Sequence, residues 1–187
     1  MMRRIRVVCL VIVIGGGGLL GGARDAATAE GPMDFELRSD AFAHGETIPL
    51  THTCDGEDRS PALAWTAPPA GTKSLALVVD DPDAPMGRWV HWVVYHLPPS
   101  VRRLPEAFPR DAELPDGTRQ GRTDFGRTGY GGPCPPSGTH HYRFILYALD
   151  VSPPLAPGAA LRELEQAMRG HILAQATLVG TYRRTGR

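Results

Sequence analysis

The sequence lacks an excess of charge of either sign. Its 187 residues include 20 basic and 20 acidic side chains, so the formal net charge is zero when histidine is neutral. Domains that bind nucleic acid usually carry a dominant basic face, and none stands out here. We therefore expect no nucleic acid among the partners.

Two common catalytic motifs are also missing. No two histidines are separated by three residues, as in helix-borne zinc sites, and no Gly-x-Ser-x-Gly segment is present. Internal repeats and a linker between domains are absent as well. The sequence predicts a single domain that is not an enzyme, with no catalytic residues, no metal and no cofactor.

The chain has no long uninterrupted apolar run. The longest, from Val7 to Leu20, contains four consecutive glycines, and a spanning helix needs about 20 strongly apolar residues. Three arginines precede it (Arg3, Arg4 and Arg6), and Ala27-Thr28-Ala29 follows. This pattern predicts a signal peptide over residues 1–29, cleaved after Ala29, and hence a periplasmic or secreted protein. The alternative is an uncleaved anchor.

Cysteine is scarce, and its count changes with cleavage. Removal of residues 1–29 leaves a domain over residues 30–187 with 16 basic and 19 acidic side chains, and it leaves Cys54 and Cys134. In an oxidising compartment these two can form a disulfide, which the chain-entropy model credits with about 4 to 5 kcal/mol. Two separate buried thiols are the alternative, because sequence does not show proximity.

Short apolar runs bounded by Gly, Pro, Asp and Ser recur along the chain and predict a mainly β domain. The expected strands cover residues 35–37, 63–65, 74–79, 90–96, 143–149 and 177–182. The continuous apolar run from Leu75 to Val79 indicates a strand that is buried on both faces. Helical spacing is convincing only from Ala159 to Gln175. The segment from Pro115 to Gly138 is too long for a plain hairpin, and such loops are often functional.

Three segments carry polar groups suited to a binding site. Asp80 to Pro85 follows the buried strand, His91 lies between Trp89 and Trp92, and the glycine-rich stretch from Gly129 to Gly138 leads to His140. Taken alone, each has a plain structural interpretation: a charged turn, a packed core histidine and a tight loop.

Together these segments resemble the two signature regions of the phosphatidylethanolamine-binding protein family, in its bacterial Raf-kinase-inhibitor-like branch. The resemblance rests on motifs that occur in the same order from Phe35 to Tyr182. They are Thr53-Cys54-Asp55-Gly56, Asp81-Pro82-Asp83-Ala84-Pro85 with Trp89 and His91, Thr123-Asp124-Phe125-Gly126, Gly-Pro-x-Pro-Pro-x-Gly with His140-His141-Tyr142, and Gly170-His171-Ile172-Leu173-Ala174.

The resemblance implies a sandwich of two packed antiparallel sheets with one C-terminal helix, short peripheral helices and a pocket for anions, including phospholipid headgroups. The implied ligand-binding residues are Asp81, Asp83, Pro85, His91, Gly132, Pro133, Cys134, Pro135, His140 and Tyr142. Protonated histidine and the tyrosine hydroxyl can donate hydrogen bonds to phosphate oxygens. A neighbouring carboxylate favours the charged imidazolium, so we expect Asp81 to orient His91 or His140, or to accept from an ammonium headgroup.

The sequence therefore predicts an exported, non-catalytic protein that binds small anions or phospholipid headgroups. The resemblance also implies a second hypothesis, inhibition of an exported protease through the surface around the pocket. A third is a metal-dependent hydrolase, since two histidines and a carboxylate can hold a catalytic metal. The oligomeric state is left open.

Overall fold

The computed structural model describes residues 35–184 of the chain. The predicted signal peptide, residues 1–29, lies outside this range. Among the described residues, no helix has the length and apolar character needed to span a membrane.

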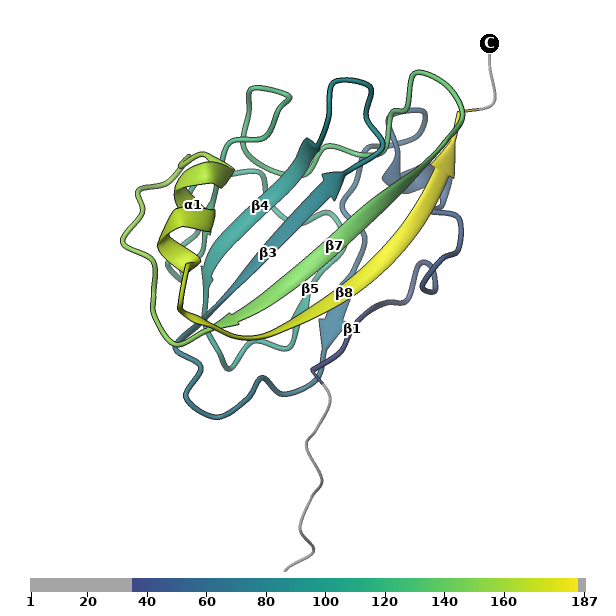
Figure 1. Ribbon diagram of the computed structural model, residues 1–187. Coiled ribbons are helices and arrows are strands. Elements are labelled where there is room, and N and C mark those ends of the chain that lie inside the picture. The colour runs from purple at the N-terminus through teal and green to yellow at the C-terminus, as the bar shows by residue number, and fades with distance from the viewer. Residues whose placement is uncertain (1–34, 185–187) are drawn as a thin grey trace, which may run out of the picture. The chain divides into compact units, whose positions relative to one another are not determined.

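Two antiparallel sheets form the domain, as predicted (Figure 1). The smaller sheet has the order β1-β2-β5, with β1 at Leu37–Ser39, β2 at Leu63–Trp65 and β5 at Arg103–Leu104. The larger has the order β6-β4-β3-β7-β8, with β6 at Arg119–Gln120, β4 at Trp89–Leu97, β3 at Ser74–Asp81, β7 at Thr139–Leu149 and β8 at Ile172–Arg183. One 3₁₀ turn, η1, covers Leu50–His52, and one helix, α1, covers Leu161–Met168.

Strand β3 is the centre of the large sheet, and all eight of its residues are buried. Its side chains alternate between two apolar layers. Leu75, Leu77 and Val79 pack with the residues of the small sheet. Ala76 and Val78 pack on the other face, in the layer that contains α1. This confirms the prediction of a strand buried on both sides.

The helix is shorter than the spacing predicted. Leu161, Leu164 and Met168 form its buried stripe, but the helix ends at Met168 rather than at Gln175. Gly170 adopts a φ of 79°, which reverses the chain, and Ile172 then pairs with Leu149 as the start of β8. Backbone pairing with β7 outweighs helical propensity here, so Ile172 and Gln175 matched the helical period by coincidence.

The predicted strands are present with shifted ends. Residues 63–65 coincide with β2, while β7 and β8 begin earlier than predicted because they pair along almost their whole length. The short strands β5 and β6 have two residues each and no sequence signal. The long segment 115–138 is irregular apart from β6.

Truncating the centre of β3 should destabilise the domain strongly. Leu77 is fully buried, so Leu77→Ala should lower the free energy of unfolding by about 2 to 5 kcal/mol through lost apolar contact and a cavity. Urea unfolding followed by circular dichroism measures this. Leu173→Ala is the control, because Leu173 is 43% exposed and the expected loss is within about 0.5 kcal/mol. Equal losses in the two variants would contradict the packing described.

Candidate functional site

Two consecutive carboxylates, Asp80 and Asp81, end strand β3 and serve opposite faces of the sheet. Asp80 is fully buried and bound by Arg143, with Nε to Oδ1 at 2.8 Å and Nη2 to Oδ2 at 2.9 Å. Arg88 also binds Asp80 and extends to Glu165 of α1. The segment from Asp80 to Pro85 is therefore an exposed charged turn only after Asp81.

Asp81 lies on the face of the small sheet and binds His140. The Nδ1 atom of His140 is 2.7 Å from Oδ2 of Asp81, and both side chains are buried. Because the carboxylate accepts, Nδ1 carries the proton, and Nε2 is left for a ligand. The other oxygen, Oδ1, accepts the backbone N–H of Asp83 at 2.8 Å. Both contacts fix the carboxylate at the start of the β3–β4 turn.

A β-bulge in β4 positions His91. Val79 pairs with Trp92, whereas the next residue, Asp80, pairs with Val90, so His91 is the extra residue. A bulge bends its strand and redirects the side chain at that point. The His91 ring consequently stands edge-on to Tyr142, with centroids 5.2 Å apart. It is thereby on the same side of the sheet as Asp81 and His140.

Gly131 holds the His91 ring and backbone together. The carbonyl of Gly131 accepts from Nδ1 of His91 at 2.6 Å, and its N–H donates to the His91 carbonyl at 2.9 Å. A carbonyl only accepts, so Nδ1 carries the proton and Nε2 is left over, as in His140. A side chain at Gly131 would require Phe125 to move, since a Cβ would lie 2.4 Å from the Phe125 ring.

The electrostatics of His91 differ from the sequence-based expectation. Burial lowers the pKa of His91, and the opposing charge of Asp81 is the smaller effect. Asp81 does raise the pKa of His91, as expected, but burial is the larger effect, so the net shift is downward. Its ring is neutral in the free protein at neutral pH, with Nε2 as an acceptor.

Tyr142 lies beneath the two histidines. Its hydroxyl is buried, with the carboxylate of Asp81 and the backbone of Cys134 as polar neighbours. Burial, followed by the negative charge of Asp81, raises the pKa of Tyr142 well above its ordinary value. The group therefore remains a protonated donor.

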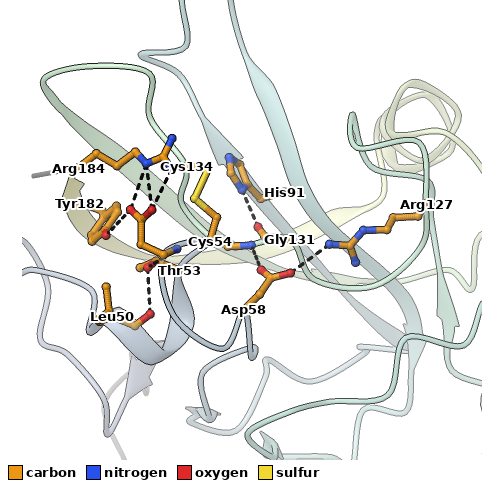
Figure 2. Close-up of a disulfide and its surroundings, with 12 residues drawn as sticks. Leu50, Thr53, Cys54, Asp58, His91, Arg127, Gly131, Cys134, Tyr182 and Arg184 are labelled. Atoms are coloured by element: carbon orange, nitrogen blue, oxygen red, sulfur yellow. Dashed lines mark hydrogen bonds and ion pairs between the residues drawn. A yellow bond between two sulfur atoms is a disulfide. The ribbon is translucent and has the colours of Figure 1, made fainter. Parts of the chain in front are cut away.

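The segment 131–136 forms a wall beside His91, and Figure 2 shows its residues Gly131 and Cys134. Gly132 donates its N–H to Oδ1 of Asp58 at 2.6 Å, and Asp58 is itself held by Arg127. A Cβ at Gly132 would lie 2.5 Å from the carbonyl oxygen of His52, so only glycine fits. These contacts fix the path of the chain as it approaches Cys134.

The structure confirms the disulfide between Cys54 and Cys134, whose Cα atoms are 5.4 Å apart. Next to it, the Cys54 N–H donates to the carbonyl of Pro133 at 3.1 Å. Figure 2 shows the bond between Cys54, which lies just after η1, and the wall. The alternative of two separate thiols is thereby excluded.

These groups surround a cavity of about 440 Å³. Its lining residues are Asp81, Ala84, Pro85, Met86, Trp89, His91, Phe125, Cys134, Pro135, Pro136 and His140. Six of the predicted ligand-binding residues are among them: Asp81, Pro85, His91, Cys134, Pro135 and His140.

The other four predicted residues lie outside this lining. Asp83 is exposed and accepts hydrogen bonds from the ring and the backbone N–H of His141, and these contacts lower the pKa of Asp83. Gly132 is hydrogen-bonded to Asp58, and Pro133 is hydrogen-bonded to Cys54. Tyr142 is buried below the cavity.

Sequence reasoning missed part of the apolar rim. Met86, which is 95% exposed, belongs to none of the family motifs, whereas Trp89, Phe125 and Pro136 occur in them without being predicted as ligand-binding residues. Their common signal is position, because each lies one to five residues from a predicted polar site residue or within a family motif.

Comparison with known proteins gives a consistent result. The family model described as phosphatidylethanolamine-binding protein matches residues 38–183. A UPF0098 protein of Methanothermobacter thermautotrophicus is 51% identical over 150 residues, which is 80% of this chain and 99% of that protein. The UPF0098 protein PH1269 of Pyrococcus horikoshii is 44% identical over 188 residues, covering 98% of this chain and 91% of its own.

Two solved structures are similar over most of their length. The protein YbcL of E. coli, described as a member of the mammalian PEBP family, has a TM-score of 0.75 at 36% identity. The alignment covers 81% of this chain and 99% of YbcL. The PEBP homolog CT736 of Chlamydia trachomatis has a TM-score of 0.73 at 41% identity, over 80% of this chain and 97% of CT736.

The disulfide should be complete in protein that has not been reduced. In a chain carrying Cys9→Ser, thiol titration after unfolding in denaturant should find no free thiol, because Cys54 and Cys134 are the remaining cysteines. Replacing both with serine should lower the free energy of unfolding by about 4 to 5 kcal/mol, since the bond spans 80 residues. Two titratable thiols in the unreduced protein would contradict the bond.

Proposed function

The chain belongs to the phosphatidylethanolamine-binding protein family, and on that basis we propose that it is an exported, non-catalytic protein that binds small anions and phospholipid headgroups. The proposed site is the cavity between the β3–β4 turn and the 131–136 wall. Its proposed ligand atoms are phosphate oxygens and, beside Asp81, an ammonium group.

The observation that carries the proposal is the arrangement of the two histidines. His91 and His140 both line one cavity, and in each ring Nδ1 is held by a protein acceptor. Both Nε2 atoms are left to meet a ligand, and each becomes a charged donor when the ring is protonated. Hydrogen bonds from charged donors to phosphate oxygens are roughly twice as strong as neutral ones.

The charge of Asp81 favours a zwitterionic ligand over a plain anion. A carboxylate has about four lone-pair sites, and Asp81 uses one on each oxygen, for His140 and for the N–H of Asp83. The remaining sites can accept from an ammonium group. A headgroup that carries both phosphate and ammonium satisfies the histidines and Asp81 together, whereas inorganic phosphate leaves Asp81 facing a like charge.

The proposal predicts tighter binding at lower pH. An anion favours protonated histidine, and in the free protein burial lowers the pKa of His91. Binding must therefore raise that pKa, so affinity should increase as the pH falls from about 8 to about 5 and decrease as the pH rises through the bound-state pKa. Glycerophosphoethanolamine is the suitable probe, because its phosphodiester keeps one negative charge throughout this range.

Removing the His140 ring should weaken binding of glycerophosphoethanolamine. His140→Ala deletes one charge-assisted hydrogen bond, which corresponds to a loss of about 1.5 to 3 kcal/mol, or roughly ten- to a hundred-fold in affinity. Calorimetric titration measures the affinity of the folded protein. Phosphorus NMR of the recovered ligand should find it intact, as a non-catalytic site requires.

His171→Ala is the matched control. His171 also binds an aspartate, Asp150, through Nδ1 at 2.7 Å, but it does not line the cavity. Its replacement should leave the affinity unchanged. If His140→Ala lowered the melting temperature and left the affinity of the folded protein at the wild-type value, His140 would be a packing residue and the proposed site would be wrong.

A further inference from the structure

The wall of the cavity is held in two different ways along its length. At its start, Gly131 is hydrogen-bonded to His91 in both directions, and Gly132 is bonded to Asp58. From Cys134 to Pro136 the wall lines the cavity itself. Prolines have no N–H to donate, so this part has few ways to be fixed by hydrogen bonds.

The residues just after η1, Thr53 and Cys54, hold the second part of the wall. Cys54 donates its N–H to Pro133 and is bonded through sulfur to Cys134. The residue before it, Thr53, is fixed to Leu50 through its N–H and its hydroxyl. The disulfide thus connects a braced segment to the part of the wall that touches the ligand space, while Cys54 itself lies outside the lining.

We propose that the Cys54–Cys134 disulfide controls ligand binding, so that the cavity is competent when the bond is formed and loses affinity when it is reduced. This inference rests on the proposed function, because it concerns the same cavity. Loss of the bond leaves the Cys134–Pro136 wall with several conformations. A binding-competent conformation populated only part of the time weakens the apparent affinity by that fraction.

The bond is accessible to reduction. Cys54 is exposed and Cys134 is partly buried, so a dithiol reagent can attack the sulfur of Cys54. The attacking thiolate forms a mixed disulfide with Cys54 and releases the thiolate of Cys134, which takes up a proton. The second thiol of the reagent then closes its own disulfide and releases Cys54, so two electrons pass from the reagent to the protein.

Binding and reduction are consequently linked. If the oxidised protein binds a ligand tenfold more tightly than the reduced protein, saturating ligand makes the bond about tenfold harder to reduce. For this two-electron couple a tenfold change corresponds to about 30 mV. The protein would then bind in oxidising surroundings and release its ligand in a reducing compartment.

The experiment compares the full chain with its Cys54→Ser variant, both carrying Cys9→Ser. Cys54→Ser removes the bond but keeps Cys134 in the cavity lining, so the one chemical change in the lining is that the Cys134 sulfur becomes a thiol. Titration with glycerophosphoethanolamine should give an affinity about tenfold weaker for the variant than for the oxidised chain. The oxidised chain treated with a phosphine reductant should match the variant.

Leu77→Ala, also in the Cys9→Ser background, separates this effect from general loss of stability. It destabilises the core without touching the wall, so the folded protein should bind as tightly as the oxidised chain. Equal affinities of the oxidised chain and Cys54→Ser would overturn the proposal. An equal loss in Leu77→Ala would overturn it too, because the effect would then be one of stability alone.

Amide hydrogen exchange tests the same coupling without a ligand. Reduction should speed exchange at the Cys54 N–H, which is bonded to Pro133, by at least about tenfold, while the Gly131 N–H bonded to His91 keeps its protection. Unchanged exchange at Cys54 would overturn the proposal. If the oxidised chain binds no glycerophosphoethanolamine, the proposed function fails, and this exchange result alone decides whether the disulfide holds the wall.

Discussion

Two adjacent buried carboxylates at the end of β3 set the main constraint on this structure. A buried charge costs several kcal/mol unless it is paired, and consecutive side chains of a strand point to opposite faces. Asp80 therefore needs its partner on one side of the sheet and Asp81 on the other. Arg143 and Arg88 meet Asp80, and His140 meets Asp81. The second pairing places a histidine where β3 ends and β7 begins, which is where the cavity forms.

The rest of the site is built around that pair. The bulge in β4 brings His91 to the same face, and Gly131 fixes its ring so that Nε2 is left for a ligand. The disulfide then holds the wall that follows Gly131. Each of these devices restricts a group that would otherwise be mobile, and preorganised donors lose less entropy when they bind. Because the disulfide holds the wall, the proposed site depends on whether Cys54 is bonded to Cys134. Cys54 is distant in sequence from the residues that line the cavity.

The sequence predicted what depends on local pattern. The continuous apolar run at Leu75 predicted the buried strand, and the other short apolar runs predicted further strands. The antiparallel sandwich and six residues of the cavity lining were implied by the resemblance of the ordered motifs to the family. The errors arose where contacts between residues distant in sequence determine the local structure or the pKa. Helical spacing ran on to Gln175 because pairing between β7 and β8 leaves no local signal. The lowered pKa of His91 follows from burial behind Phe125 and Tyr142, and sequence alone also left the pairing of the cysteines open.

The ring nitrogens of His91 and His140 test the central claim most directly. Long-range proton–nitrogen NMR distinguishes the two tautomers of a neutral ring and detects a ligand at either nitrogen. Both neutral rings should carry the proton on Nδ1, and glycerophosphoethanolamine should shift the Nε2 resonances far more than those of Nδ1. A proton on Nε2 in either neutral ring, or Nε2 resonances that ignore the ligand, would contradict the account.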